Sequence, residues 1–342
     1  MLGKVLTAVA IAYVLGAAVW LAAGGMVPDE TPTELLNVAC DPTRELWRDV
    51  NARFIDHYER EQGVRLTIKM SHGGSASQAR AVIDGLEADV VTLGLWSDTS
   101  AVHKRGLIDA GWDNRLPYRA LPYYSTIVFV VRKGNPEQIR DWPDLLKPGV
   151  QIITPNPKTS GNGKLSFLAA WGAEKQRTGS EDAALAYVSA LYKKVPVLDS
   201  GARGSTTTFA QKGIGHVHLT WENEAYLEVE EAKGALEVVY PPRSIRAEPP
   251  VAMVDANVRK KGTKPAAEAY LRFLYTDEAQ DLIALHRYRP SDPKAMERNR
   301  DKFPDIQMFP ITTVEPGGWD AANDRFFKDG AVFDQIYARN QK

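Results

Sequence analysis

Apolar and polar residues follow two patterns along this chain, one typical of strands and one typical of helices, and segments of the two kinds alternate. Four short apolar runs flanked by turn residues are typical of buried strands: 35–40, 65–70, 88–95 and 125–134. Between them, residues 41–58 and 75–86 carry apolar side chains at helical spacing. Strands that alternate with helices favour a parallel sheet covered by helices, so we expect an α/β fold.

A second α/β set starts near residue 150 and includes a predicted helix at 164–178. The apolar segment 249–254 then suggests a return to the first set, which two helices within 262–286 complete. We therefore expect two lobes. Lobe 1 is formed by residues 33–121 and, as its second part, residues 250–342, which include a C-terminal segment. Lobe 2 is formed by residues 122–249. The 342 residues, 44% of them hydrophobic, are enough for more than one core.

The first residues have the pattern of a targeting segment. Lys4 is followed by no charged residue until Asp29, and residues 5–23 are almost wholly apolar, as in a secretory signal. The apolar stretch is also close to the roughly 20 residues that span a bilayer. Residues 1–32 are thus predicted as a signal peptide that is cleaved or as an anchor that is retained, and both predict export.

Charge and catalytic patterns exclude several functions. The net charge is −1 with both signs interspersed, so no broad basic surface for nucleic acid is expected. Glu222 and Glu224 have no recognisable nucleophile or orienting base, which predicts a solvated or structural role and no enzyme. His216 and His218 could share a strand face, but without a third ligand we expect exposed histidines, no metal site and no cofactor.

Three Ser/Gly segments stand where loops turn into helices, at residues 71–75, 156–163 and 199–205. A helix N-terminus presents unpaired N–H groups and a partial positive charge, which suit an anion. In open α/β sheets, ligands bind at the carboxyl ends of strands, where such loops lie. Several of these N-termini directed at one point predict a site for a small anion.

The order and spacing of eight segments, covering nearly the whole chain from Leu35 onward, resemble the periplasmic sulfate-binding proteins of ABC importers. The segments are LLNVACDPTREL, SHGGS, STIVFVVRKGNP, ITPNPKTSG, LAAWG, LDSGARGST, WENEA and KKGTKPAAEAYL. The resemblance implies a type II periplasmic binding protein fold, with two α/β lobes joined by crossover strands and a ligand cleft between them. It also implies a periplasmic, monomeric protein that delivers sulfate to an ABC permease.

The resemblance further implies particular ligand-binding residues. The expected backbone N–H donors are Asp41, Ser75, Gly161 and Ala202, joined by the Ser160 hydroxyl, the Trp221 indole N–H and Asn162. All of the donor groups are uncharged. Because a carboxylate would repel the anion, we expect the Asp41 side chain to cap its own helix, so that only its N–H faces the ligand.

Two further expectations follow from the same comparison. Where the family usually continues with Gly and then Ala-Arg after the NPK[ST]SG segment, this chain has Asn162, Gly163 and Lys164, so the start of the helix is altered. Arg203, in the DSGARGS segment, is expected to brace its loop without contacting the anion.

Donors alone suit sulfate, which carries no proton at neutral pH and can only accept hydrogen bonds. Phosphate retains a proton and needs an acceptor, without which a buried donor is left unpaired. Thiosulfate, in which sulfur replaces one oxygen, is a close alternative ligand. Two alternatives belong to other functional classes: a membrane-tethered sulfate sensor or scaffold, and an exported enzyme that processes an anion.

Overall fold

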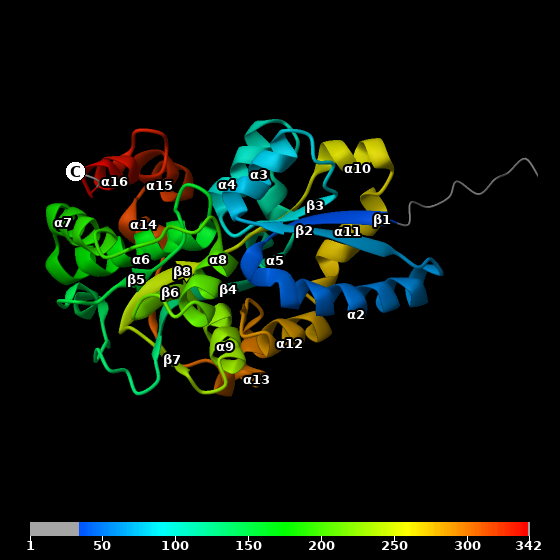
Figure 1. Ribbon diagram of the computed structural model, residues 1–342. Coiled ribbons are helices and arrows are strands. Elements are labelled where there is room, and N and C mark those ends of the chain that lie inside the picture. The colour runs from blue at the N-terminus through cyan, green and yellow to red at the C-terminus, as the bar shows by residue number, and fades with distance from the viewer. Residues whose placement is uncertain (1–33, 341–342) are drawn as a thin grey trace, which may run out of the picture.

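Two separate β-sheets organise the chain into two α/β lobes, seen side by side in Figure 1. The structure is a computed structural model, and it describes residues 34–340. The predicted targeting segment 1–32 lies outside this range. Within the described range, no helix is long and apolar enough to cross a membrane.

The first sheet has the strand order β2-β1-β3-β9. Its strands are β1(Glu34–Cys40), β2(Thr67–Gly73), β3(Val90–Thr92) and β9(Val251–Met253). The first three are parallel, as the sequence predicted, and β9 joins β3 antiparallel after the chain returns from the other lobe. The helices of this lobe are α2(Arg44–Gln62), α3(Ser75–Ile83), α4(Trp96–Lys104), α10(Asp255–Lys261), α11(Lys264–Phe273) and α12(Asp277–Leu285).

Helix α2 illustrates why these segments fold as they do. Its apolar residues recur one helical turn apart, and Leu46, Val50 and Phe54 form part of a buried stripe. It ends at Gly63, whose φ of +69° is the left-handed conformation that glycine adopts without a Cβ penalty. This packing fixes the N-terminal end of the helix, which lies next to β1.

The second sheet is organised around β4(Tyr123–Arg132), which carries the chain over from the first lobe. Its other strands are β5(Ile152–Ile153), β6(Val217–Trp221), β7(Leu236–Val239), β8(Arg243–Ala247), β10(Arg289–Pro290) and β11(Gln307–Phe309). Strand β4 runs antiparallel to β6, β7, β8 and β10, whereas β5 pairs with β6 and β11 pairs with β8 in parallel. This sheet is therefore mixed, and the expectation of a parallel sheet holds for β1, β2 and β3 of the first lobe.

The remaining elements surround the second sheet or connect the lobes. They are η1(Asp41–Thr43), η2(Trp112–Asn114), α5(Pro117–Ala120), η3(Trp142–Leu146), α6(Gly161–Thr178), α7(Glu181–Tyr192), α8(Ala202–Thr206), η4(Thr207–Gln211), α9(Glu222–Glu231), α13(Pro293–Arg298), η5(Arg300–Lys302), α14(Ile311–Val314), α15(Gly318–Phe326) and α16(Val332–Asn340). Helix α6 is buried along most of its length. The C-terminal segment packs on this lobe, because β11 pairs with β8, α14 contacts α6 and α16 contacts α7.

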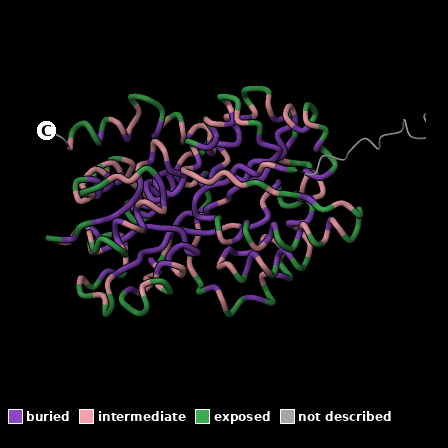
Figure 2. Tube along the Cα trace, turned by 45° about the vertical axis from the view of Figure 1, so that its right-hand side comes forward, coloured by how far each residue is buried: buried purple, intermediate pink, exposed green. Residues whose placement is uncertain are grey.

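Buried residues follow the strands and the inner helix faces of both lobes, while loops and outer helix faces are exposed (Figure 2). One hydrophobic cluster extends from Trp47 in the first lobe through Tyr123 to Phe167 in the second. The two lobes are therefore in contact through a shared hydrophobic cluster.

Candidate anion-binding site

Helix N-termini from both lobes meet at one point between the sheets. Helix η1 begins at Asp41 and α3 at Ser75, while α6 begins at Gly161, α8 at Ala202 and α9 directly after Trp221. Around this point lies a cavity lined by Cys40, Asp41, Pro42, Gly73, Gly74, Ser75, Gly94, Ser160, Gly161, Asn162, Ala202 and Trp221. All of the ligand-binding residues expected from the sequence are in this lining.

The cavity is small and largely buried. The space in it that admits the centre of a water-sized sphere is about 10 Å³, and Ser75, Ser160 and Trp221 are each at most 2% exposed. The lobes touch closely beside it, since a Cβ added to Gly74 would collide with the carbonyl oxygen of Thr159 and lie 3.2 Å from that of Ser200. Only a ligand of a few heavy atoms fits here.

The indole of Trp221 is a buried donor without an acceptor. Its Nε1 has no hydrogen-bond partner among the described residues, although the side chain is fully buried and lines the cavity. A buried N–H of this kind costs about 1–3 kcal/mol unless something accepts from it. The cavity thus suits an acceptor that the described part of the chain does not supply.

The two serines of the cavity differ in what their hydroxyls do. Ser75 Oγ donates to Asp98 Oδ2 at 2.5 Å and accepts from the Gly94 N–H at 2.9 Å, which leaves its backbone N–H for a ligand. Ser160 Oγ accepts from the Gly163 N–H at 3.4 Å as the N-cap of α6. Its own proton stays available, which agrees with the donor role expected for this hydroxyl.

The expected conformation of Asp41 is wrong. The N-cap of η1 is Cys40, and no side chain caps this turn. The Asp41 carboxylate instead accepts from Arg44 Nη2 at 2.8 Å, one turn along the helix. Because Asp41 is already the first residue of the turn, a guanidinium three residues on is better placed for its carboxylate than the backbone N–H groups.

Asn162 and Lys164 occupy the altered start of α6. The Asn162 Nδ2 donates to the Leu219 carbonyl at 3.3 Å, so its side chain is tied to β6. Lys164 is buried and its Nζ lies 3.1 Å from Asp98 Oδ1 and 2.9 Å from Asn323 Oδ1. This ion pair joins the lobes, and its only sequence signal was a lysine in the interior of an otherwise buried helix.

Arg203 lies outside the cavity lining, as expected, and bridges two glutamates. It forms ion pairs with Glu45 of the first lobe and, at 3.4 Å, with Glu224. Burial raises the pKa of Glu224 to about 8, against the opposing effect of Arg203. Glu222 is also buried and pairs with Arg289 at 2.7 Å, so both glutamates have structural surroundings.

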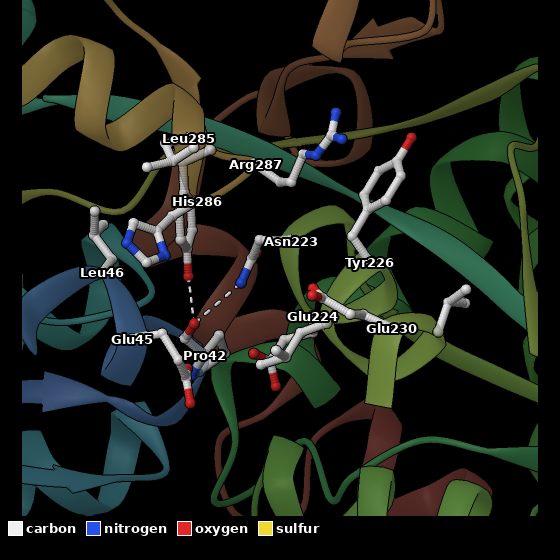
Figure 3. Close-up of a pocket in the computed structure, with 13 residues that line it drawn as sticks. Pro42, Glu45, Leu46, Asn223, Glu224, Tyr226, Glu230, Leu285, His286 and Arg287 are labelled. Carbon is white, nitrogen blue, oxygen red and sulfur yellow. Dashed lines mark hydrogen bonds between the residues drawn. The ribbon is translucent and has the colours of Figure 1, made fainter. Parts of the chain in front are cut away.

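A larger pocket adjoins the cavity and shares Pro42 with it (Figure 3). The Pro42 carbonyl accepts from Asn223 Nδ2 at 3.0 Å and from the Tyr288 hydroxyl at 2.6 Å. Asn223 belongs to α9 of the second lobe, so its hydrogen bond spans the lobes next to Asp41. The other residues lining this pocket include Glu45, Glu224, Glu230, His286 and Arg287.

The expectation of exposed histidines is wrong, since His216 is half-buried and its Nδ1 accepts from the Gln151 N–H at 3.0 Å. His218 is fully buried, and its Nδ1 lies 2.8 Å from Glu228 Oε2, whereas an exposed side chain was expected. Its strand, β6, lies between β4 and β5, which explains the burial. Within residues 34–340, no group of three or more His, Cys, Asp or Glu side chains is arranged to hold a metal ion.

Comparison with known proteins identifies the family. Residues 36–289 match the family described as bacterial extracellular solute-binding protein. The chain belongs to this family. The solute-binding protein described here is 51% identical to the sulfate-binding protein of Escherichia coli (strain K12) over 308 residues, which covers 90% of this chain and 93% of that one.

Two other relatives of this solute-binding protein are informative. It is 47% identical to the thiosulfate-binding protein of Pseudomonas aeruginosa over 322 residues, covering 94% of this chain and 96% of that one. The solved structure of the sulfate-binding protein SubI from Mycobacterium tuberculosis H37Rv has a TM-score of 0.78 at 33% identity, covering 86% of this chain and all of that one. The predicted two-lobed binding-protein fold is confirmed.

Proposed function

We propose that this solute-binding protein encloses sulfate between its lobes and delivers it to an ABC permease, without catalysis. The observation that carries the proposal is the donor-lined cavity between the lobes, in which the Trp221 Nε1 has no acceptor among residues 34–340. The 51% identity to a sulfate-binding protein supports the same ligand. Helix N-termini contribute the remaining N–H donors.

The donor set selects the ligand by its protonation. Sulfate at neutral pH has only acceptors, so each N–H and the Ser160 hydroxyl can find a partner on it. Hydrogen phosphate carries a proton that would face one of the donors of the cavity. A buried donor left without an acceptor costs about 1–3 kcal/mol. In the described part of the chain, the ionisable groups that line the cavity are Cys40 and Asp41, and the Asp41 carboxylate is paired with Arg44.

Thiosulfate is the second candidate ligand. It presents the same unprotonated acceptors with one oxygen replaced by sulfur, and the 47% identity to a thiosulfate-binding protein favours it. The larger sulfur needs more room than oxygen. The two ligands are therefore separated by a competition measurement, not by the type of donor.

We further propose that binding and closure are coupled, and that the protein works as an exported monomer on the periplasmic side of the membrane. Donors from both lobes can bind one anion together only when the lobes meet, so the ligand favours the closed state by its differential affinity. A membrane partner would then receive the anion from the closed form.

Calorimetric titration of the purified protein with sulfate, thiosulfate, phosphate and molybdate at pH 7 tests this proposal. We expect dissociation constants of about 1 μM or lower for sulfate or thiosulfate, and no heat from phosphate. Ser160→Ala should weaken binding, whereas Ser166→Ala, one helical turn and a half further along α6, should not. Binding of none of the four anions would overturn the proposal.

A further inference from the structure

We propose that Lys158 is a positioning residue for the anion, and that the C-terminal turn between α15 and α16 serves through it as the support of the anion-binding loop 156–160. The inference rests on the proposed function. It assigns a role in binding to a segment that contributes no residue to the cavity lining.

The Lys158 ammonium is held by three oxygens of the C-terminal segment. Its Nζ donates to the Phe327 carbonyl at 2.9 Å, to Asp329 Oδ1 at 2.9 Å and to Asp334 Oδ2 at 3.0 Å. Partial burial opposes the charge, but the two carboxylates outweigh it and raise the pKa of Lys158. Asp329 is fully exposed, so the Phe327 carbonyl and Asp334 are the stronger partners.

The loop that carries Lys158 also carries the anion donors. Lys158 lies two residues before Ser160, and its backbone N–H donates to Asn156 Oδ1 at 2.9 Å, which closes a tight turn. The Ser160 N–H donates to the Asn156 carbonyl at 2.9 Å. A movement of the lysine is therefore transmitted through one turn to the Ser160 hydroxyl and the Gly161 N–H.

The same loop holds the second anion-binding loop of this lobe. The Thr159 hydroxyl donates to the Ser200 carbonyl at 2.7 Å, and the Asn156 N–H donates to the Asp199 carbonyl at 2.8 Å. Residues 199–201 lead directly into Ala202 at the start of α8. The support at Lys158 thus acts on both groups of donors that the second lobe provides.

Little displacement of this loop is tolerated. The Thr159 carbonyl lies where a Cβ on Gly74 would collide with it, so the first lobe closes directly against the loop. Hydrogen bonds weaken steeply when their geometry changes, and a small shift of the loop would affect donors on both sides of the cavity. The contacts of Lys158 with the C-terminal segment thus hold loop 156–160 in its position against the first lobe.

Lys175 provides a matched control on the same part of the molecule. Its side chain is 26% exposed, like that of Lys158. Its Nζ also contacts a carboxylate, that of Glu181, and donates to a backbone carbonyl of the C-terminal segment, that of Val314, at 3.2 Å. It lies near the far end of α6, away from the cavity. A purely structural role would make the two lysines equivalent.

The test measures sulfate affinity and dissociation rate for Lys158→Met, Lys158→Arg, Asp334→Asn and Lys175→Met, together with the melting temperature without ligand. We expect Lys158→Met and Asp334→Asn each to weaken affinity about tenfold, mainly through faster dissociation. Lys158→Arg should restore part of the loss. The double variant Lys158→Met/Asp334→Asn should bind sulfate no more weakly than the weaker of its two single variants, because both substitutions remove the same contact.

Lys175→Met should lower the melting temperature as much as Lys158→Met but leave the affinity within about twofold of wild type. Wild-type affinity in both Lys158→Met and Asp334→Asn, or an equal loss in Lys175→Met, would overturn the inference while the proposed function stands. If Lys158→Met does not fold, Asp334→Asn decides, since it keeps the lysine and the acceptor for the Gly330 N–H. A wild-type protein that binds neither sulfate nor thiosulfate would overturn both proposals.

Discussion

At the scale of single residues, the indole of Trp221 gives the sharpest test of the site. Trp221→Phe keeps an aromatic ring in a fully buried position but removes the Nε1 donor. A hydrogen bond to a charged acceptor contributes about 1.5–3 kcal/mol, so we expect sulfate affinity to fall about 10- to 150-fold. Calorimetric titration checks this, and an unchanged affinity would remove Trp221 from the site.

Gly74 tests closure in the same way. It has an ordinary φ of −60°, so alanine is compatible with its backbone conformation, but the added Cβ would collide with the Thr159 carbonyl of the other lobe. Overpacking typically costs about 1–3 kcal/mol, and here the cost falls on the closed state alone.

We therefore expect Gly74→Ala to weaken sulfate binding about 5- to 150-fold while the melting temperature without ligand is unchanged. Affinity and melting temperature measured on one preparation give both values. A variant that binds like wild type would show that the lobes do not close as tightly as this structure has them.

The residues at the helix starts could be predicted from the sequence, whereas their side-chain partners could not. Ser75, Gly161 and Ala202 begin helices because Gly and Ser favour such turns locally, and this information lies within a few neighbouring residues. The pairing of Lys164 with Asp98 joins positions 66 residues apart, and His218 is buried by strands on either side. Contacts of this kind depend on tertiary packing.

At the scale of elements, helix α6 links the cavity to the C-terminal segment. Gly172, in its buried part, faces that segment, and a Cβ there would lie 2.6 Å from Phe309 Cζ and 2.9 Å from Val314 Cγ2. The cavity end of the helix, Gly161, is about three turns away. Stability and anion affinity should therefore respond differently to a change at Gly172.

We expect Gly172→Ala to lower the free energy of unfolding by up to about 2 kcal/mol, because overpacking costs about 1–3 kcal/mol and outweighs the gain of about 1 kcal/mol in helix propensity. Denaturant unfolding followed by circular dichroism measures this, and calorimetry should show sulfate affinity within about twofold of wild type. A more stable variant would contradict the packing of β11 and α14 on α6.

The order of strands and helices could largely be predicted because each element carries its own period. The predicted strand at 35–40 is β1(Glu34–Cys40), and the predicted helix at 164–178 is part of α6, which starts earlier, at Gly161. The antiparallel pairing of β4 with its neighbours could not be predicted. It depends on the direction in which the chain crosses between the lobes, and no local pattern records that direction.

At the scale of the whole molecule, the buried ion pair between Lys164 and Asp98 joins the two lobes, so we expect the loss of one partner to affect closure. Both side chains are at most 7% exposed, and they come from different lobes. Removing one partner of a buried pair costs about 3–5 kcal/mol, because the other charge stays buried without compensation. When the lobes separate, water reaches that charge, so the cost applies to closure.

Lys164→Met should therefore weaken sulfate affinity about 150- to 5,000-fold with little change in the melting temperature of the unliganded protein. Lys104→Met is the control, since its pair with Asp320 also joins α4 to the other lobe but is exposed. The control should change affinity by less than about fivefold. Equal losses in the two variants would contradict a special role for the buried pair.

The position of the cavity between the lobes has a kinetic consequence. An anion held by lining residues of both lobes keeps all of its partners while the lobes stay in contact, so we expect it to leave when they part. Its escape rate is then the rate at which the lobes part, so an excess of a second anion cannot hasten exchange. Any membrane complex that separates the lobes would therefore set the time at which the anion is released, and the affinity of the anion for the site would not.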